Sequence, residues 1–81
     1  MNKEIEYKIG DLFQKPRSKG NNNFYYISGI LIEILKNTNN KYAIEWYYQH
    51  ETITVCYTKN ELDTYCFRHG IYDWEYHPAN I

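Results

Sequence analysis

The chain has 81 residues, a formal net charge of −1 at pH 7 and a pI of about 6.3. This length indicates one domain, and the charge is not that of an obligate nucleic-acid binder, whose domain pI usually lies above about 9. Aromatic residues make up 19% of the chain and include ten tyrosines. Since each buried ring removes about 150–250 Å² from water, rings can supply much of the core of so small a domain.

The first eight residues, 1–8, are polar and are expected to form a flexible lead-in to a single domain over 9–81. No apolar run is long enough for a signal peptide or for a membrane-spanning helix, which needs about 20 apolar residues. The two cysteines, Cys56 and Cys66, are fewer than a disulfide scaffold of this size normally carries. These observations predict a cytoplasmic protein with reduced thiols and no membrane partner.

Strand-forming runs alternate with turn signals through the first half of the chain. A short strand is expected over 9–13, and 14–23 is expected to be a long loop because Pro, Gly, Ser and Asn dominate it. A second strand is expected over 24–36, with a bulge or bend at Gly29. The asparagines of 37–40 then predict a tight turn, because asparagine tolerates the left-handed conformation.

The second half begins with the clearest alternation in the chain. The strand expected over 41–49 places four large apolar residues on one face, which we expect to be the core face: Tyr42, Ile44, Trp46 and Tyr48. A turn at 50–51 leads into a strand over 52–57. On that strand the residues expected to point inward are Ile53, Val55 and Tyr57.

The chain changes character at Thr58. Thr58 or Asn60 can cap a helix, and Glu61 three residues after Thr58 gives a capping-box pattern, which predicts one helical turn. A last strand is expected within 66–76. The rings expected around this strand are Tyr72, Trp74 and Tyr76.

Four short segments resemble the SH3-like small barrels of the KOW and Tudor type. The segments are Ile9-Gly10-Asp11-Leu12, Gly29-Ile30-Leu31-Ile32-Glu33-Ile34, Tyr42-Ala43-Ile44-Glu45-Trp46, and Tyr57 followed by Glu61-Leu62. The resemblance covers residues 9–65 and implies an all-β fold, a small five-stranded SH3-like barrel with one short helical turn before the last strand. Such barrels commonly bind peptides, modified side chains or nucleic acids, and few are enzymes.

The leading hypothesis is a non-catalytic protein-binding module. Many small phage proteins share this barrel pattern, and the heavy use of Asn, Ile, Lys and Tyr resembles coding from an AT-rich genome. We therefore expect a phage-encoded accessory protein that engages a host or virion protein in the host cytoplasm. The rings expected to make the contact are Tyr25, Tyr47, Trp74 and Tyr76. Alternatively, the aromatic C-terminal tail, which contains Trp74 and Tyr76, caps the barrel and makes no contact with a partner.

Two alternative functions remain open. Lys15, Arg17 and Lys19 place three positive charges within five residues, and beside exposed tyrosines they would form a weak nucleic-acid-binding site. An ordinary solvated loop explains the same charges. The second alternative is a self-assembling structural subunit, and the oligomeric state does not follow from the sequence.

Signals for catalysis or metal binding are weak. Zinc binding would need Cys66 and His69 together with the distant Cys56 and His77. Nucleophilic catalysis would need one of the cysteines beside His50 or His69, and no orienting motif accompanies them. The acidic residues are spread through the chain without an evident pair. We therefore expect no enzyme activity, no metal and no cofactor.

Overall fold

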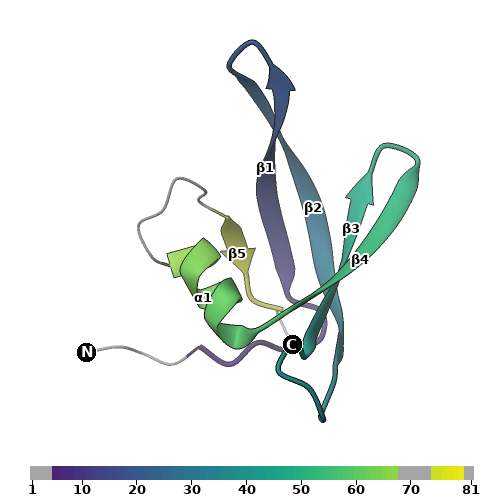
Figure 1. The fold of residues 1–81 in the computed structure, drawn as a ribbon, viewed down its shortest axis with the longest axis vertical. Coiled ribbons are helices and arrows are strands. Elements are labelled where there is room, and N and C mark those ends of the chain that lie inside the picture. The colour runs from purple at the N-terminus through teal and green to yellow at the C-terminus, as the bar shows by residue number, and fades with distance from the viewer. Residues whose placement is uncertain (1–4, 68–73, 80–81) are drawn as a thin grey trace.

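The computed structural model describes residues 5–67 and 74–79. They form a five-stranded antiparallel sheet and one helix (Figure 1). The elements are β1 (Leu12–Gly20), β2 (Asn23–Ile34), β3 (Tyr42–Tyr48), β4 (Glu51–Tyr57), α1 (Lys59–Phe67) and β5 (Glu75–His77). The order in the sheet is β4-β3-β2-β1-β5, so consecutive strands are neighbours and β5 returns to pair with β1. The mostly β class and the strand count agree with the expectation.

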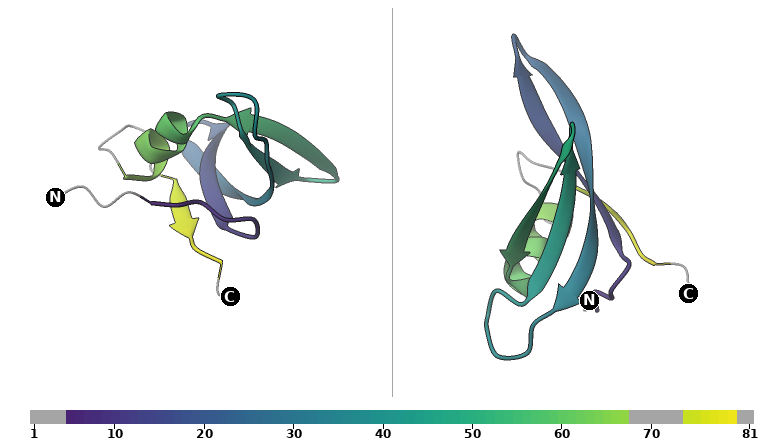
Figure 2. Two further views of the ribbon diagram at one scale, coloured as in Figure 1. Left: turned by 90° about the horizontal axis from the view of Figure 1, so that it is seen from below. Right: turned by 90° about the vertical axis from the view of Figure 1, so that its right-hand side faces the viewer.

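The sheet is curved, but in the described part of the chain it does not close into a barrel. β4 and β5 are its two edges, and α1 lies beside β5 on one side of the sheet (Figure 2). The backbone N–H of Trp74 donates to the carbonyl of Tyr65 at 3.0 Å, which ties β5 to α1. Leu62 of α1 is fully buried, so the helix fills the side on which strand pairing would have closed a barrel. We call the sheet face packed against α1 the inner face and the opposite one the outer face.

The stretch 14–23 is not a loop, and that prediction was wrong. β1 continues to Gly20 and pairs with β2 along almost its whole length, forming the long arm seen in Figure 1. The turn consists of Asn21 and Asn22, whose φ angles of 51° and 64° are the left-handed values required by a two-residue type I′ turn. The turn residues of the sequence therefore mark only the tip of the arm.

Pro16 is compatible with β1 because of where the strand lies. β5 pairs with β1 only from Leu12 to Gln14, so among the described residues no strand lies on the far side of β1 at Pro16. Proline lacks a backbone N–H, but on the open side of the strand no neighbouring strand needs that donor. The strand can therefore pass through a residue that the sequence suggested would interrupt it.

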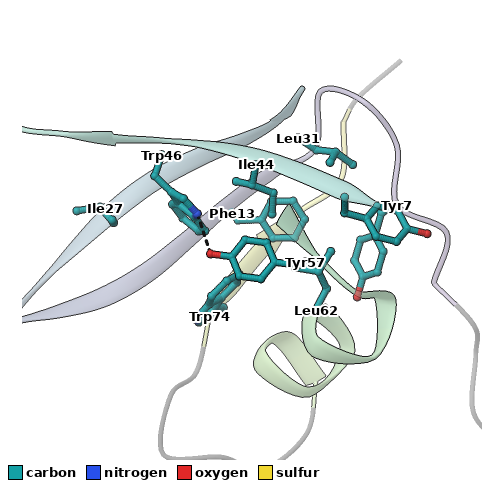
Figure 3. Packing of buried hydrophobic residues seen from close by; sticks show 10 residues of the cluster. Tyr7, Phe13, Ile27, Leu31, Ile44, Trp46, Tyr57, Leu62 and Trp74 are labelled. Carbon is teal, nitrogen blue, oxygen red and sulfur yellow. Dashed lines mark hydrogen bonds between the residues drawn. The ribbon is translucent and has the colours of Figure 1, made fainter. Parts of the chain in front are cut away.

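The core lies between the inner face and α1 (Figure 3). Its buried members are Tyr7, Phe13, Ile27, Leu31, Tyr42, Ile44, Trp46, Tyr57, Leu62 and Trp74. Tyr7 comes from the segment expected to be a flexible lead-in, yet it is 2% exposed and its hydroxyl donates to Oδ1 of Asp63 at 2.6 Å. Tyr7 therefore belongs to the core, although it lies in the segment expected to be a flexible lead-in.

The core face of β3 agrees with the prediction at Tyr42, Ile44 and Trp46, which are all buried. On β4 the burial falls from Tyr57, which is buried, to Ile53, which is 44% exposed. The β3–β4 hairpin extends past α1, so its far end has no helix to pack against (Figure 1). The alternation therefore identified the face correctly but not where the core ends.

Gly29 makes room for a tryptophan and does not form the predicted bulge. A Cβ atom at this position would lie 2.5 Å from Cε3 of Trp46 and 2.8 Å from Cγ2 of Ile44, far inside van der Waals contact. The pairing irregularity of β2 with β3 falls later, between Leu31 and Glu33. Gly29 thus lets the indole lie flat against β2 in the centre of the core.

The capping box at the start of α1 is confirmed. The backbone N–H of Thr58 donates to Oε1 of Glu61 at 2.9 Å, and the N–H of Glu61 donates to Oγ1 of Thr58 at 3.0 Å. The helix is longer than the single turn predicted, since it continues to Phe67. β5 overlaps the end of the range expected for the last strand and extends one residue beyond it, to His77, while Tyr72 falls outside the described residues.

Candidate functional site

Three cations of β1 share the inner face beyond the core. Lys15, Arg17 and Lys19 occupy alternate positions, so their side chains leave the strand on the same side. Each lies over an aromatic ring, at these distances from the ring centroid: Lys15 Nζ 4.3 Å from Trp46, Arg17 Cζ 4.8 Å from Tyr48, and Lys19 Nζ 5.5 Å from Tyr25. All three distances fall within the range of cation–π attraction.

We call Lys15, Arg17, Lys19, Tyr25 and Tyr48 the cation–aromatic surface. Its two tyrosines come from neighbouring strands of the sheet and stack on each other, with centroids 6.4 Å apart and an interplanar angle of 27°. Both rings are half-buried, whereas Arg17 and Lys19 are exposed. Cations and rings therefore alternate along the arm in one accessible strip.

Lys15 forms the deep end of this surface. Its ammonium lies 3.5 Å from the hydroxyl of Tyr57, which also accepts a hydrogen bond from Nε1 of Trp46 at 3.0 Å. Burial lowers the pKa of Lys15, and the nearby Arg17 lowers it further. A partly desolvated ammonium beside a second cation gains from a nearby anion, because the anion replaces lost hydration and offsets the repulsion.

The surface carries an uncompensated positive charge. Within the residues that the structure describes, none of its three cations forms an ion pair with a carboxylate, and the ion pair present joins Lys59 to Asp63 on α1. Glu51 pairs with Tyr48 in the β3–β4 ladder, so one carboxylate lies at the rim on the same face. The local charge therefore differs in sign from the net charge of the chain.

The four rings predicted to bind a protein are not brought together. Tyr47 is 44% exposed, but it lies on the outer face, away from Tyr25. Trp74 is buried against Trp46, so its ring is part of the core and is not open to a partner. Tyr76 is half-buried and donates its hydroxyl to Oδ2 of Asp11 at 2.8 Å. Only Tyr47 of the four presents a largely open ring.

The outer face holds apolar residues that the sequence did not single out. The large side chains exposed on it are Leu12, Phe24, Tyr26 and Tyr47. Tyr26 is 53% exposed on this face, whereas Tyr25, expected from the sequence to be a contact ring, points to the inner face. The available signal was that both alternating faces of 24–36 are apolar, which left the assignment of faces undecided.

The described residues show no cluster of metal ligands. No three or more His, Cys, Asp or Glu side chains gather there in a way that could hold a metal ion, and His69 lies outside the described range. Cys56 is exposed on β4, while Cys66 is half-buried on α1. The two thiols thus lie on different elements in different environments.

The cysteines should differ in reactivity. Burial, together with the nearby carboxylate of Asp63, raises the pKa of Cys66 to about 12. Because the thiolate is the reactive form, we expect Cys66 to react about a hundredfold more slowly than an ordinary exposed thiol near pH 8. Titration with an aromatic disulfide reagent should show one fast and one slow thiol, and Cys56→Ser should remove the fast phase. Loss of the slow phase instead would contradict the assignment.

Comparison of the chain with models of protein families, with curated proteins and with solved structures finds no match. In the described part of the chain, no helix has the length and apolar character needed to cross a bilayer. Kinship to SH3-like barrels and origin in a phage therefore stay predictions, and any function has to be argued from the surfaces themselves.

Proposed function

We propose that this chain is a non-catalytic binding module that holds single-stranded nucleic acid on its cation–aromatic surface. The observation that carries the proposal is the line of three cations on β1, each over a ring and none paired with a carboxylate in the described residues. Alternate strand residues lie about 7 Å apart. This spacing suits the successive phosphates of an extended strand.

Unpaired bases are favoured because the surface offers rings beside the cations. Base–aromatic stacking contributes about 1–3 kcal/mol per base and does not depend on sequence. Tyr25 and Tyr48 lie next to the exposed Arg17 and Lys19, so a base can approach a ring while its phosphate meets a cation. A duplex hides its base faces and would leave this part of the surface unused.

The binding should be weak and sensitive to salt. Three phosphate contacts on a single strand predict a slope of about −2 in a plot of log K against log salt concentration. The net charge of −1 adds no long-range attraction. We therefore expect binding at low ionic strength that fades towards physiological salt.

The test uses the tryptophans of the chain. Trp46 lies 4.3 Å from Nζ of Lys15, so its fluorescence should change when a phosphate engages that ammonium. We expect a saturable change on adding short oligothymidine at low salt, a slope of about −2 with salt, and weaker binding of a duplex of the same length. Arg17→Gln with Lys19→Gln should reduce the affinity at least about tenfold.

A matched control is available at a second group of lysines. Lys36 and Lys41 line an open hollow beside the start of α1, and Lys41 also lies over a ring, 5.5 Å from the centroid of Tyr42. Lys36→Gln with Lys41→Gln makes the same charge change, and we expect it to leave affinity nearly unchanged. Equal losses of oligonucleotide affinity in the two double variants would reject the proposal, and so would the absence of oligonucleotide binding at low salt.

Protein binding through the outer face is the second candidate. It is supported by the large apolar side chains exposed there, because exposed apolar side chains that gather on one face can form a contact site. The partner in this case would be a host or virion protein. Tyr26→Ser with Tyr47→Ser should abolish capture of that partner while leaving oligonucleotide binding intact. Unchanged capture would exclude this face.

We also propose kinship to the SH3-like barrels. Its support is the strand sequence, in which four consecutive antiparallel strands are followed by a helix and a last strand that returns to β1. The open gap between β4 and β5 is the departure from that pattern. An experimental structure with the strand order altered, or with β5 away from β1, would reject the kinship.

A further inference from the structure

The two edges of the sheet differ in how they are protected from pairing with another strand. β5 is three residues long and is followed by Pro78, and the open side of β1 carries Pro16 among three cations. Natural proteins protect edges with short strands, proline and charge. β4 spans seven residues, and in the described part of the chain no strand pairs with its far side.

The β4 edge has none of these protections over 52–57. The residues there are Thr52, Ile53, Thr54, Val55, Cys56 and Tyr57, with no charge, proline or glycine. Thr52, Thr54 and Cys56 are exposed, and Ile53 is 44% exposed although its face is the core face. The sequence therefore combines high strand propensity with an accessible backbone edge.

We propose that β4 pairs antiparallel with β4 of a second copy of this chain, which joins the two sheets into one continuous sheet. The two-fold axis passes beside Thr54, so that Thr54 opposes Thr54 of the second copy. Ile53 then opposes Val55 of the second copy on the inner face. On the outer face, Thr52 opposes Cys56 of the second copy.

This register is selected by the strand itself. It opposes apolar with apolar residues on one face and small or polar residues on the other, which stabilises an antiparallel pair. Moving the axis to Thr52 would oppose Ile53 with Glu51. Moving it to Cys56 would oppose Ile53 with Lys59, where α1 has already begun. Only the axis at Thr54 pairs the whole strand with itself.

The charges of the strands favour pairing with a second copy at the β4 edge and disfavour it at the open side of β1. The segment 52–57 is uncharged, so two copies meet there without repulsion. The same arrangement at β1 would bring Lys15, Arg17 and Lys19 of both copies together. The inference does not rest on the proposed function, because β2 and β3 separate β4 from β1. The three cations of the cation–aromatic surface lie on β1 and stay accessible in the pair.

The first test is the mass of the full chain in solution. The monomer mass is 9.9 kDa, and light scattering should give twice this value at high protein concentration. Thr54→Lys should return the protein to a monomer, because it places two ammonium groups opposite each other. In the monomer Thr54 pairs with Glu45 of β3, so the new lysine gains a favourable neighbour and the fold should be kept. A wild-type chain that stays monomeric at high concentration would overturn the proposal.

The second test reports the register. With Cys56→Ser in the background, Thr54→Cys places a thiol opposite its own copy, whereas Thr52→Cys opposes a different residue. Since a disulfide needs closely opposed Cβ atoms, Thr54→Cys should form a covalent dimer at least about tenfold faster than Thr52→Cys in an oxidising glutathione buffer. The half-buried thiol of Cys66 is common to both variants and cancels in the comparison. Equal rates would overturn the register, and no covalent dimer would overturn the pairing.

Discussion

Replacing Trp74 with alanine should unfold a large fraction of the molecules. The ring is 9% exposed and packs on Tyr65 with centroids 4.6 Å apart and on Trp46 at 5.1 Å. Removing a buried tryptophan costs about 3–5 kcal/mol. Because a domain of this length has a total stability of about 4–12 kcal/mol, the loss approaches the whole. Urea unfolding followed by circular dichroism measures it.

Tyr47→Ala is the matched control, because it also removes a large ring but from the outer face. We expect it to lower the free energy of unfolding by less than about 1 kcal/mol, as surface substitutions usually do. Equal losses of unfolding free energy in Trp74→Ala and Tyr47→Ala would show that Trp74 does not support the core. The comparison also explains why Trp74→Ala is unsuited to testing a contact with a partner, since it removes the fold first.

Asp11→Ala should give the second large loss, about 3 kcal/mol. The side chain is 1% exposed and accepts hydrogen bonds from the backbone N–H of Lys8 at 2.8 Å, the hydroxyl of Tyr76 at 2.8 Å and the N–H of Ala79 at 2.7 Å. Hydrogen bonds to a charged group contribute about 1.5–3 kcal/mol each, and water recovers part of this when the segment around Ala79 comes loose. Urea unfolding gives the free energy.

Tyr76→Phe removes only one of the three donors and should cost about 1 kcal/mol. Amide hydrogen exchange at Ala79 separates the two variants, because only Asp11→Ala should release this N–H to solvent. We propose that the Asp11 carboxylate links the segment around Lys8 to the segment around Ala79. An Asp11→Ala protein with wild-type stability and a protected Ala79 amide would contradict this role.

Local signals in the sequence were sufficient for part of the fold. The alternation over 41–49 identified the buried face of β3, and Thr58 with Glu61 identified the start of α1. Both features depend on residues within one turn or one strand. They can be read without knowing what the segment packs against, and this is why they agree with the structure.

The cation–aromatic surface could not be predicted because it depends on pairing between strands. The sequence placed Lys15, Arg17 and Lys19 together but suggested a loop, since proline, glycine, serine and asparagine dominate that stretch. Pairing with β2 and stacking on rings from β2 and β3 override that preference. The register also decides that Tyr25, and not Tyr26, lies beside these cations.

The return of β5 to β1 has a consequence for the order in which the chain folds. Leu12 pairs with His77, so this ladder closes over a far longer stretch of chain than the β1–β2 and β3–β4 hairpins. Hairpins with short connections form quickly, whereas distant pairings must first overcome the entropy of loop closure. During synthesis on the ribosome, both hairpins can therefore form while Phe13 and Trp46 still lack the ring of Trp74. Until that ring arrives, the nascent chain exposes an unfinished aromatic core to its surroundings.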